Sequence, residues 1–328
     1  MRRVSSIVRV ATFVRSWSGL QAWRERRMRG ALILVYHGVA KKLRHDDLDS
    51  YVISQAELRR HVRYIKSLTD VIHLRDLLKN PEAGVARKQR IAAITFDDAL
   101  VSQLTLAADV MTDLKVPWSI AVPAGLVEDQ HPVWTNWVRV MARFLPADRR
   151  AIAGGQVLDQ ALLEKSGSSL IHHLMHHVTS EQRDRQIQEL QDSVGVNRIR
   201  DAIMADGRFV MATWSQLRAV LGTGCEILSH GWSHRPHNSF ICESDRVTEI
   251  VRSRYLIEQR LGVAPIGFAY PHGITSDTSA ALLAKSGYEF ALSTRGSWIT
   301  SLDRWNVPRF DGEYPLHVLR RHLTWPRS

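Results

Sequence analysis

The chain has 328 residues, of which 45% are hydrophobic and 23% are charged. It is long enough for one large α/β domain, or for one domain with an appendage, and its composition is that of a globular protein. The two cysteines, Cys225 and Cys242, form neither a disulfide framework nor a CxxC metal motif. A small disulfide-stabilised scaffold is therefore excluded.

The formal net charge of +11 comes mainly from the N-terminal segment, where residues 1–30 contain eight arginines and one glutamate. Apolar residues recur there at every third or fourth position, which predicts a basic amphipathic helix. Such a helix can lie on an anionic membrane surface or pack on its own domain, and the pattern alone does not separate the two. Arginines interrupt the run expected of a signal peptide, and no segment has the ~20 apolar residues of a membrane span. We expect a cytoplasmic location, with peripheral contact to the inner membrane through residues 1–30 as an open alternative, and no nucleic-acid partner.

From residue 31 onward, apolar runs of strand length alternate with helical patterns. A strand, a helix and a strand within some thirty residues make a βαβ unit, so the sheet should be parallel. The count of seven or eight strands favours a (β/α) barrel, complete or incomplete, over an open sheet. Strands are expected over 31–38, 91–96, 117–122, 225–230, 265–270, 288–293 and 305–310. Helices are expected over 54–68, 100–114, 214–221, 243–261, 277–285 and 316–323.

Residues 130–210 interrupt this alternation. Helical patterns over 134–145 and 181–192 predict a helical insertion that forms a cap over or beside the site. The segment 172–177 contains four histidines, which on a polar helix are more often solvent-facing than metal ligands. We expect three parts: an N-terminal helix at 1–30, a barrel over 31–328, and the insertion within that barrel.

Chemistry-bearing residues follow several of the predicted strands. Asp97 and Asp98 end the apolar run 91–96, where adjacent carboxylates disfavour each other's ionisation unless a cation or donor compensates them. On their own they fit a capped turn as well as a metal or acid–base site. His37 ends the first strand, and His230 and His234 follow the strand at 225–230. Because ligand sites of parallel α/β folds lie at the C-terminal strand ends, we expect these groups to meet.

The order of three motifs is informative: Thr95-Phe96-Asp97-Asp98, then Ser229-His230-Gly231-Trp232-Ser233-His234, then Phe268-Ala269-Tyr270-Pro271-His272-Gly273. This order resembles the polysaccharide deacetylase family, the NodB homology domain, over about residues 31–310. The opening Tyr36-His37-Gly38-Val39 is similar to the branch that acts on poly-N-acetylglucosamine-like polymers.

The resemblance implies a distorted (β/α) barrel that hydrolyses the N-acetyl group of an amino sugar in a glycan or a lipid-linked precursor. It implies a divalent metal ion held by Asp98, His230 and His234, with zinc first and nickel, cobalt or ferrous iron as alternatives. It also implies Asp97 as the general base. One carboxylate would neutralise the metal while the other accepts a proton from water.

The chain departs from the family pattern at three points. Ala99 stands where glycine is usual, so the turn after Asp98 must suit an alanine. Ala269 replaces the arginine of the RxPY motif, and we expect Arg309 to pair with Asp97 instead. The late leucine-x-histidine motif has no clear counterpart, since His317 falls in a predicted helix. His37 and His272 are therefore the candidates for the general acid, because both end predicted strands.

Two alternatives to a glycan deacetylase stay open. The same metal and barrel could hydrolyse a non-sugar amide or imide, which would release ammonia in place of acetate. A non-catalytic glycan-binding relative would bind metal or sugar without turnover, and the missing arginine and histidine motifs favour that alternative.

Overall fold

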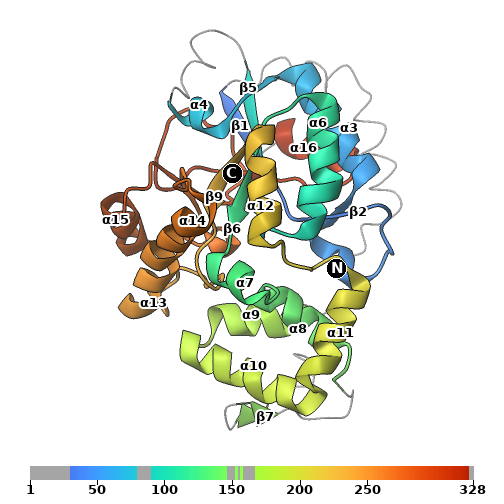
Figure 1. Cartoon of the computed structure of the whole chain (residues 1–328), viewed down its shortest axis with the longest axis vertical. Coiled ribbons are helices and arrows are strands. Elements are labelled where there is room, and N and C mark those ends of the chain that lie inside the picture. The colour runs from blue at the N-terminus through green and yellow to red at the C-terminus, as the bar shows by residue number, and fades with distance from the viewer. Residues whose placement is uncertain (1–29, 80–89, 146–151, 154–155, 158–166, 325–328) are drawn as a thin grey trace.

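A curled sheet of parallel strands lies at the centre of the computed structural model, which describes residues 30–79, 90–145, 152–153, 156–157 and 167–324 (Figure 1). Seven strands follow one another in the order β11-β10-β9-β6-β5-β1-β12, and the short β4 pairs with β5. The bounds are β1 Ala31–Tyr36, β4 Asp70–Val71, β5 Ile91–Phe96, β6 Trp118–Val122, β9 Cys225–Ser229, β10 Phe268–Ala269, β11 Ala291–Leu292 and β12 Phe310–Asp311. The predicted strands are present, although the last three are shorter than the sequence suggests.

Strands β1 and β5 form the most regular pair of the sheet. All six residues of each strand are buried, which explains why both read as unbroken apolar runs. They pair in register from Ala31 opposite Ile91 to Tyr36 opposite Phe96. His37 and Asp97 therefore leave the sheet side by side, and the Asp97 amide donates to the Tyr36 carbonyl at 2.9 Å.

The chain near Arg309 closes the sheet toward a barrel. Val307 bridges to Leu292 at the end of β11, and Phe310 then pairs with Leu34 of β1. One short segment thus spans the two ends of the curled sheet. The prediction of a distorted (β/α) barrel with about seven strands is confirmed.

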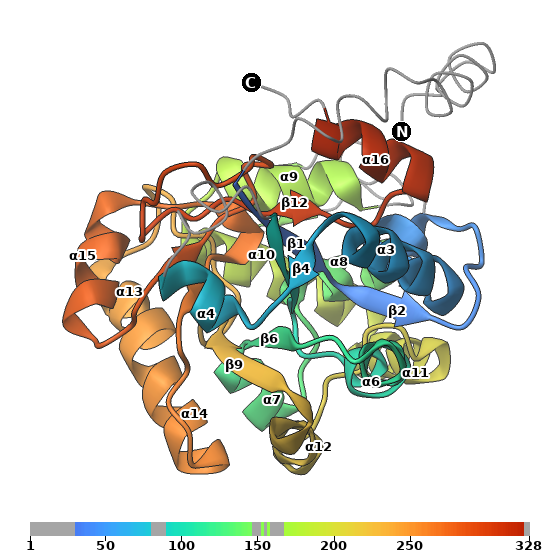
Figure 2. The ribbon, with the colours of Figure 1, turned by 90° about the horizontal axis from the view of Figure 1, so that it is seen from above.

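Helices surround the strands (Figure 2). They are α3 Gln55–Leu68, α4 Leu74–Lys79, α6 Ala108–Leu114, α7 Ala124–Asp129, α12 Trp214–Val220, α13 Glu243–Val247, α14 Ser253–Leu261, α15 Asp277–Lys285 and α16 Leu316–Thr324. The Ser54 side chain caps α3 by accepting from the Glu57 amide, as its sequence predicts. Two small strands, β2 (Gly38–Ala40) and β3 (Val52–Ser54), form a separate pair. The 3₁₀ turn η1 (Asp47–Tyr51) lies between them in the chain, and further 3₁₀ turns are η4 (Leu221–Thr223) and η6 (Pro271–Gly273).

Two helices expected to be continuous contain a π-helical turn. The first is η2, Gln103–Ala107, which precedes α6, and the second is η5, Thr248–Arg252, which joins α13 to α14. The expectation of uninterrupted α-helices is wrong at these turns. Each turn carries a buried polar side chain, Gln103 or Glu249, that bonds to loops at the strand ends. Such turns often occur where a helix serves a functional site.

The predicted insertion contains four helices grouped at one end of the molecule (Figure 1). They are α8 Trp134–Ala142, α9 Ser168–His176, α10 Ser180–Val194 and α11 Val196–Asp206, with a small hairpin of β7 (Ile152–Ala153) and β8 (Gln156–Val157). Their apolar residues form a cluster around Trp137 that is distinct from the barrel core. Of the four histidines at 172–177, three are exposed and His173 is half-buried.

The predicted N-terminal helix lies outside the described residues, so its membrane contact stays a prediction. Among the helices that the structure describes, none is long and apolar enough to cross a membrane. Both cysteines are free, with Cys225 buried in β9 and Cys242 exposed at the start of α13.

Candidate active site

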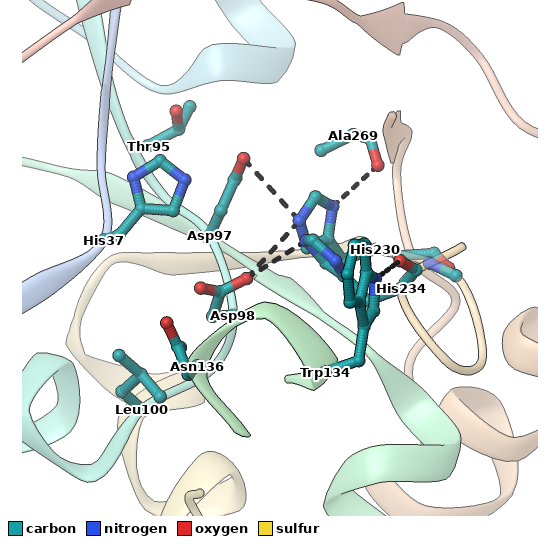
Figure 3. Close-up of polar contacts among 12 residues, drawn as sticks. His37, Thr95, Asp97, Asp98, Leu100, Trp134, Asn136, His230, His234 and Ala269 are labelled. Atoms are coloured by element: carbon teal, nitrogen blue, oxygen red, sulfur yellow. Dashed lines mark hydrogen bonds and ion pairs between the residues drawn. The ribbon is translucent and has the colours of Figure 1, made fainter. Parts of the chain in front are cut away.

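Three predicted ligands meet at the C-terminal ends of β5 and β9 (Figure 3). The Oδ1 atom of Asp98 lies 3.6 Å from His230 Nε2 and 3.4 Å from His234 Nε2. All three side chains are buried. Their ligand atoms lie within 4.8 Å of one another, and this is the single such cluster found among the described residues.

The donor atoms of this cluster fit a metal ion. Asp98 Oδ1 and His230 Nε2 are buried and lack a hydrogen-bond partner. Their spacing of 3.6 Å is too long for a hydrogen bond. It is close to the roughly 3.4 Å between two ligands that each lie about 2.1 Å from a tetrahedral ion. Burial raises the pKa of Asp98 and lowers that of His234, so a cation would compensate the carboxylate while His234 stays neutral.

The backbone of β10 fixes the orientation of His230. The ring Nδ1 lies 2.7 Å from the carbonyl oxygen of Ala269, to which it donates (Figure 3). This assigns the proton to Nδ1 and leaves the lone pair of Nε2 directed at Asp98. Ala269, which stands at the family's arginine position, therefore contributes through its backbone.

Arg309 pairs with Asp97, as predicted from the sequence. Two guanidinium nitrogens donate to the two carboxylate oxygens at 2.8 Å each, and a third contact of 3.1 Å reaches the Thr95 hydroxyl. Burial opposes ionisation of Asp97, but the charge of Arg309 and its hydrogen bonds outweigh burial and hold the pKa of this carboxyl well below its usual value. Asp97 Oδ2 lies 3.8 Å from His230 Nε2, so the ionised carboxylate reaches the cluster of Asp98, His230 and His234.

His37 has a carboxylate partner in Glu313, near the C-terminal helix. One Glu313 oxygen accepts both from the His37 amide at 2.5 Å and from its ring Nδ1 at 2.9 Å. Burial alone would favour the neutral ring, but the charge of Glu313 and its hydrogen bond raise the pKa of His37 to about 10. His37 is therefore a protonated imidazole at neutral pH, with its Nε2 free of Glu313.

His272 also lies at the site, but in a different state. Its ring packs edge-on against His234 at 4.5 Å and against Trp134 at 5.6 Å between centroids. Burial, together with the nearby charge of Arg183, lowers its pKa well below the usual value. His272 is thus neutral where His37 is charged. His317 lies on α16 and does not line the cavity.

Left-handed backbone is concentrated at this site. Four of the seven described non-glycine residues with positive φ are Asp98 (81°), Ala99 (53°), His234 (60°) and His272 (59°). Such conformations cost about 1–2 kcal/mol each, so the surroundings must hold them. Ala99 adopts the left-handed turn that a glycine would adopt more easily.

Two buried residues hold these turns. The Gln103 amide donates to the carbonyls of Asp97 at 2.5 Å and His37 at 2.9 Å, which ties both strand ends together. Glu249 accepts from the amides of Trp232 at 2.8 Å and Ser233 at 3.0 Å, in the turn between His230 and His234. A Cβ at Gly231 would lie 2.3 Å from Glu249 Oε2, so glycine is required there.

A cavity of about 240 Å³ opens onto this cluster and continues along the insertion. The barrel contributes His37, Asp98, His234 and His272 to its wall, and the insertion contributes residues that include Asn136, Arg139 and Met175. Helix α8 also contacts the turn of His234 directly, because the Trp134 indole donates to the His234 carbonyl at 3.0 Å.

Sequence reasoning missed four of the residues that build the site: Gln103, Glu249, Glu313 and Trp134. Each lies within a stretch that reads as an ordinary helix or loop, and each acts through contacts far along the chain. The signal that could have found Gln103 is a polar residue on the otherwise apolar face of the predicted helix 100–114. Glu313 has no such local signal.

The sequence model of the polysaccharide deacetylase family matches residues 84–291, more than half of the chain. None of the curated protein sequences compared with the chain matches it.

Solved structures with the same fold include IcaB from Ammonifex degensii, at 16% identity and a TM-score of 0.55, covering 91% of this chain and 98% of that one. The deacetylase PplD of Streptococcus pyogenes matches at 12% identity and a TM-score of 0.56, covering 89% and 97%. A de-N-acetylase from Aggregatibacter actinomycetemcomitans matches at 14% and 0.53, covering 89% and 99%. The chain belongs to the polysaccharide deacetylase family, hydrolases that remove N-acetyl groups from glycans.

Proposed function

We propose that this protein is a metal-dependent deacetylase of an amino-sugar glycan, with Asp98, His230 and His234 as metal ligands, Asp97 as general base and His37 as general acid. The observation that carries the proposal is the different surroundings of the two adjacent carboxylates. Asp97 is paired with Arg309, whereas Asp98 faces two histidine rings with an unpartnered oxygen. Asp98 is thus suited to bind a cation, and Asp97 is suited to accept a proton.

Two histidines and one carboxylate leave coordination positions open, which is typical of catalytic rather than structural sites. We propose zinc, and the donor set also suits nickel, cobalt or ferrous iron. The chemistry that a bound divalent cation supplies is a lowered pKa for water and polarisation of the acetamide carbonyl. Asp97 needs that chemistry, because a carboxylate whose pKa is held low is a weak base.

Two residues of the chain then carry out the two proton transfers. Asp97 accepts a proton from the water that attacks the acetamide carbon, and Arg309 keeps its carboxylate in place. The C–N bond breaks, and the protonated His37 donates from Nε2 to the leaving amine nitrogen, since its Nδ1 is held by Glu313. The products are acetate and a free amine. The high pKa of His37 and the low pKa of His272 favour His37 as the acid.

We also propose that helices α8 to α11 act as one substrate-binding insertion on the barrel. Their support is the shared cavity wall and the bond from Trp134 to the turn of His234.

Acetate release from N-acetylglucosamine oligomers and from lipid-linked amino sugars tests the proposal. Zinc-loaded protein should release one acetate for each new free amine. Asp97→Asn should retain metal, measured by elemental analysis, while its kcat falls by about 10²- to 10⁴-fold. Release of ammonia instead of acetate, or metal binding without any turnover, would refute the glycan deacetylase function.

A further inference from the structure

Arg139 is a buried cation on the wall of the cavity. It lies on α8, is 9% exposed, and lines the cavity together with Asp98 and His272. One guanidinium nitrogen donates to the Asn136 side-chain oxygen at 3.1 Å, and the group lies 4.9 Å over the ring of Tyr51. Within the described part of the chain, no carboxylate lies at ion-pair distance from it.

The other buried arginines of the described chain all have carboxylate partners. Arg309 pairs with Asp97, Arg183 with Asp184, and Arg208 with three aspartates. Burial lowers the pKa of Arg139, but a guanidinium stays protonated at neutral pH. A buried charge is unfavourable unless it is paired. Asn136 and Tyr51 orient this guanidinium without neutralising it.

The remaining charges of the site do not neutralise Arg139 either. Asp97 is balanced by Arg309 and Glu313 by His37, which leaves Asp98 and Asp311 as the cavity-lining carboxylates without an arginine or lysine partner among the described residues. A divalent cation at the predicted ligands would offset both of these charges and leave that of Arg139 uncompensated. The cavity then carries excess positive charge, with a planar fork of N–H donors on its insertion side.

We propose that Arg139 binds an oxyanion carried by the glycan substrate, so that the enzyme prefers acidic N-acetylated glycans to neutral ones. The oxyanion is a carboxylate, as in a uronic acid, or a phosphate ester. This inference rests on the deacetylase function proposed above and adds a substrate class to it. Arg139 lies on the insertion and therefore contacts a part of the substrate other than the acetamide.

Three tetrasaccharides of N-acetylglucosamine test the inference: a neutral one, one with a single uronic acid, and one with a single phosphate monoester. Acetate release gives kcat/KM for each, and calorimetry on zinc-loaded Asp97→Asn, with and without the change at Arg139, gives affinity with little catalysis. The wild type should prefer at least one acidic substrate by tenfold or more. Arg139→Met should lower kcat/KM and affinity for that substrate on the order of 100-fold more than for the neutral one. The preferred acidic substrate identifies carboxylate or phosphate as the anion.

Arg139→Lys keeps the charge but loses the fork, so its preference should fall between those of the wild type and Arg139→Met. If Arg139→Met fails to fold, the substrate preference of Arg139→Lys still tests the inference. Arg200→Met removes an exposed arginine from the same insertion and should leave the preference unchanged. Equal wild-type activity on all three substrates, or an equal loss on all three in Arg139→Met, would overturn the inference but leave the deacetylase function intact. A wild type that deacetylates none of them would instead refute the proposed function.

Discussion

Replacing Arg309 with methionine would leave the Asp97 carboxylate buried without its cation. The two side chains share a bidentate pair at 2.8 Å for each contact, and Arg309 is fully buried. Methionine fills much of the arginine volume but donates no hydrogen bond. The substitution therefore removes the main interaction that lowers the pKa of Asp97 and leaves burial, which raises it.

A cation at this distance shifts a carboxyl pKa by about 1–3 units. The acidic limb of kcat/KM against pH should move upward by about that amount in Arg309→Met, because Asp97 must be ionised to accept a proton. At 1.36 kcal/mol per unit, the shift corresponds to about 1.4–4 kcal/mol. Loss of one partner from a buried pair costs a similar 3–5 kcal/mol of stability.

The pH dependence of stability gives an independent measurement. In the wild type the folded pKa of Asp97 is below the unfolded value of about 3.9, so its stabilisation is present above that pH and is lost as pH falls through the folded pKa. In Arg309→Met the folded pKa rises above 3.9, and ionised Asp97 becomes destabilising. The difference in Tm between the two proteins should be large at pH 7 and should shrink toward pH 4.

Thermal unfolding across pH and the pH profile of acetate release test this account together. Arg304→Met removes an exposed arginine five residues earlier and should shift neither curve. Arg309→Met combined with Asp97→Asn should be more stable at pH 7 than Arg309→Met alone, since no uncompensated charge remains. If Arg309→Met has the same acidic limb as the wild type, and the Tm difference between the two proteins does not change with pH, Arg309 does not control the pKa of Asp97.

Three further predictions concern the neighbours of this pair. Glu313→Gln should lower the pKa of His37, because its value of about 10 depends on that carboxylate. The alkaline limb of the kcat/KM profile should therefore move to lower pH. If the limb does not move, His37 is not the general acid. His230→Ala and Asp98→Ala should each lower zinc affinity, measured by calorimetry, at least tenfold. His173→Ala, on α9, is the control and should leave zinc affinity unchanged. An equal loss of affinity in all three variants would contradict the ligand assignment. Gln103→Met should lower the free energy of unfolding by about 1–3 kcal/mol and kcat by tenfold or more, because the carbonyls of His37 and Asp97 lose their donor. A variant with unchanged kcat would show that the Gln103 side chain does not position the site.

The parts of the site that the sequence predicts are those carried by strand ends. The apolar runs that become β1 and β5 are readable because both faces are buried, and parallel pairing brings their terminal residues together without further information. His37, Asp97 and His230 were therefore placed by topology alone. The pairing of Arg309 with Asp97 followed from the same reasoning, since Arg309 ends the last predicted strand.

The parts that could not be predicted depend on side chains reaching across the fold. Glu313 contacts His37 across 276 positions, and Glu249 reaches the turn of His234 from a π-helical turn with an ordinary helical sequence. The sequence predicts an insertion over or beside the site, but it does not predict which of its residues line the cavity. Which face of α8 turns toward the barrel depends on packing around Trp137, and periodicity within one helix does not specify that orientation.

The position of the arginine shows how the site tolerates a change in motif. The family places this cation on the strand where Ala269 stands, whereas here Arg309 reaches Asp97 from the segment that closes the barrel between β11 and β1. The pair requires only a guanidinium in the plane of the carboxylate, and both segments end beside the site. The exchange leaves the Ala269 carbonyl in place, which must still accept from His230. A missing motif arginine in a barrel of this kind therefore does not imply a missing charge, since another strand end at the site can supply it.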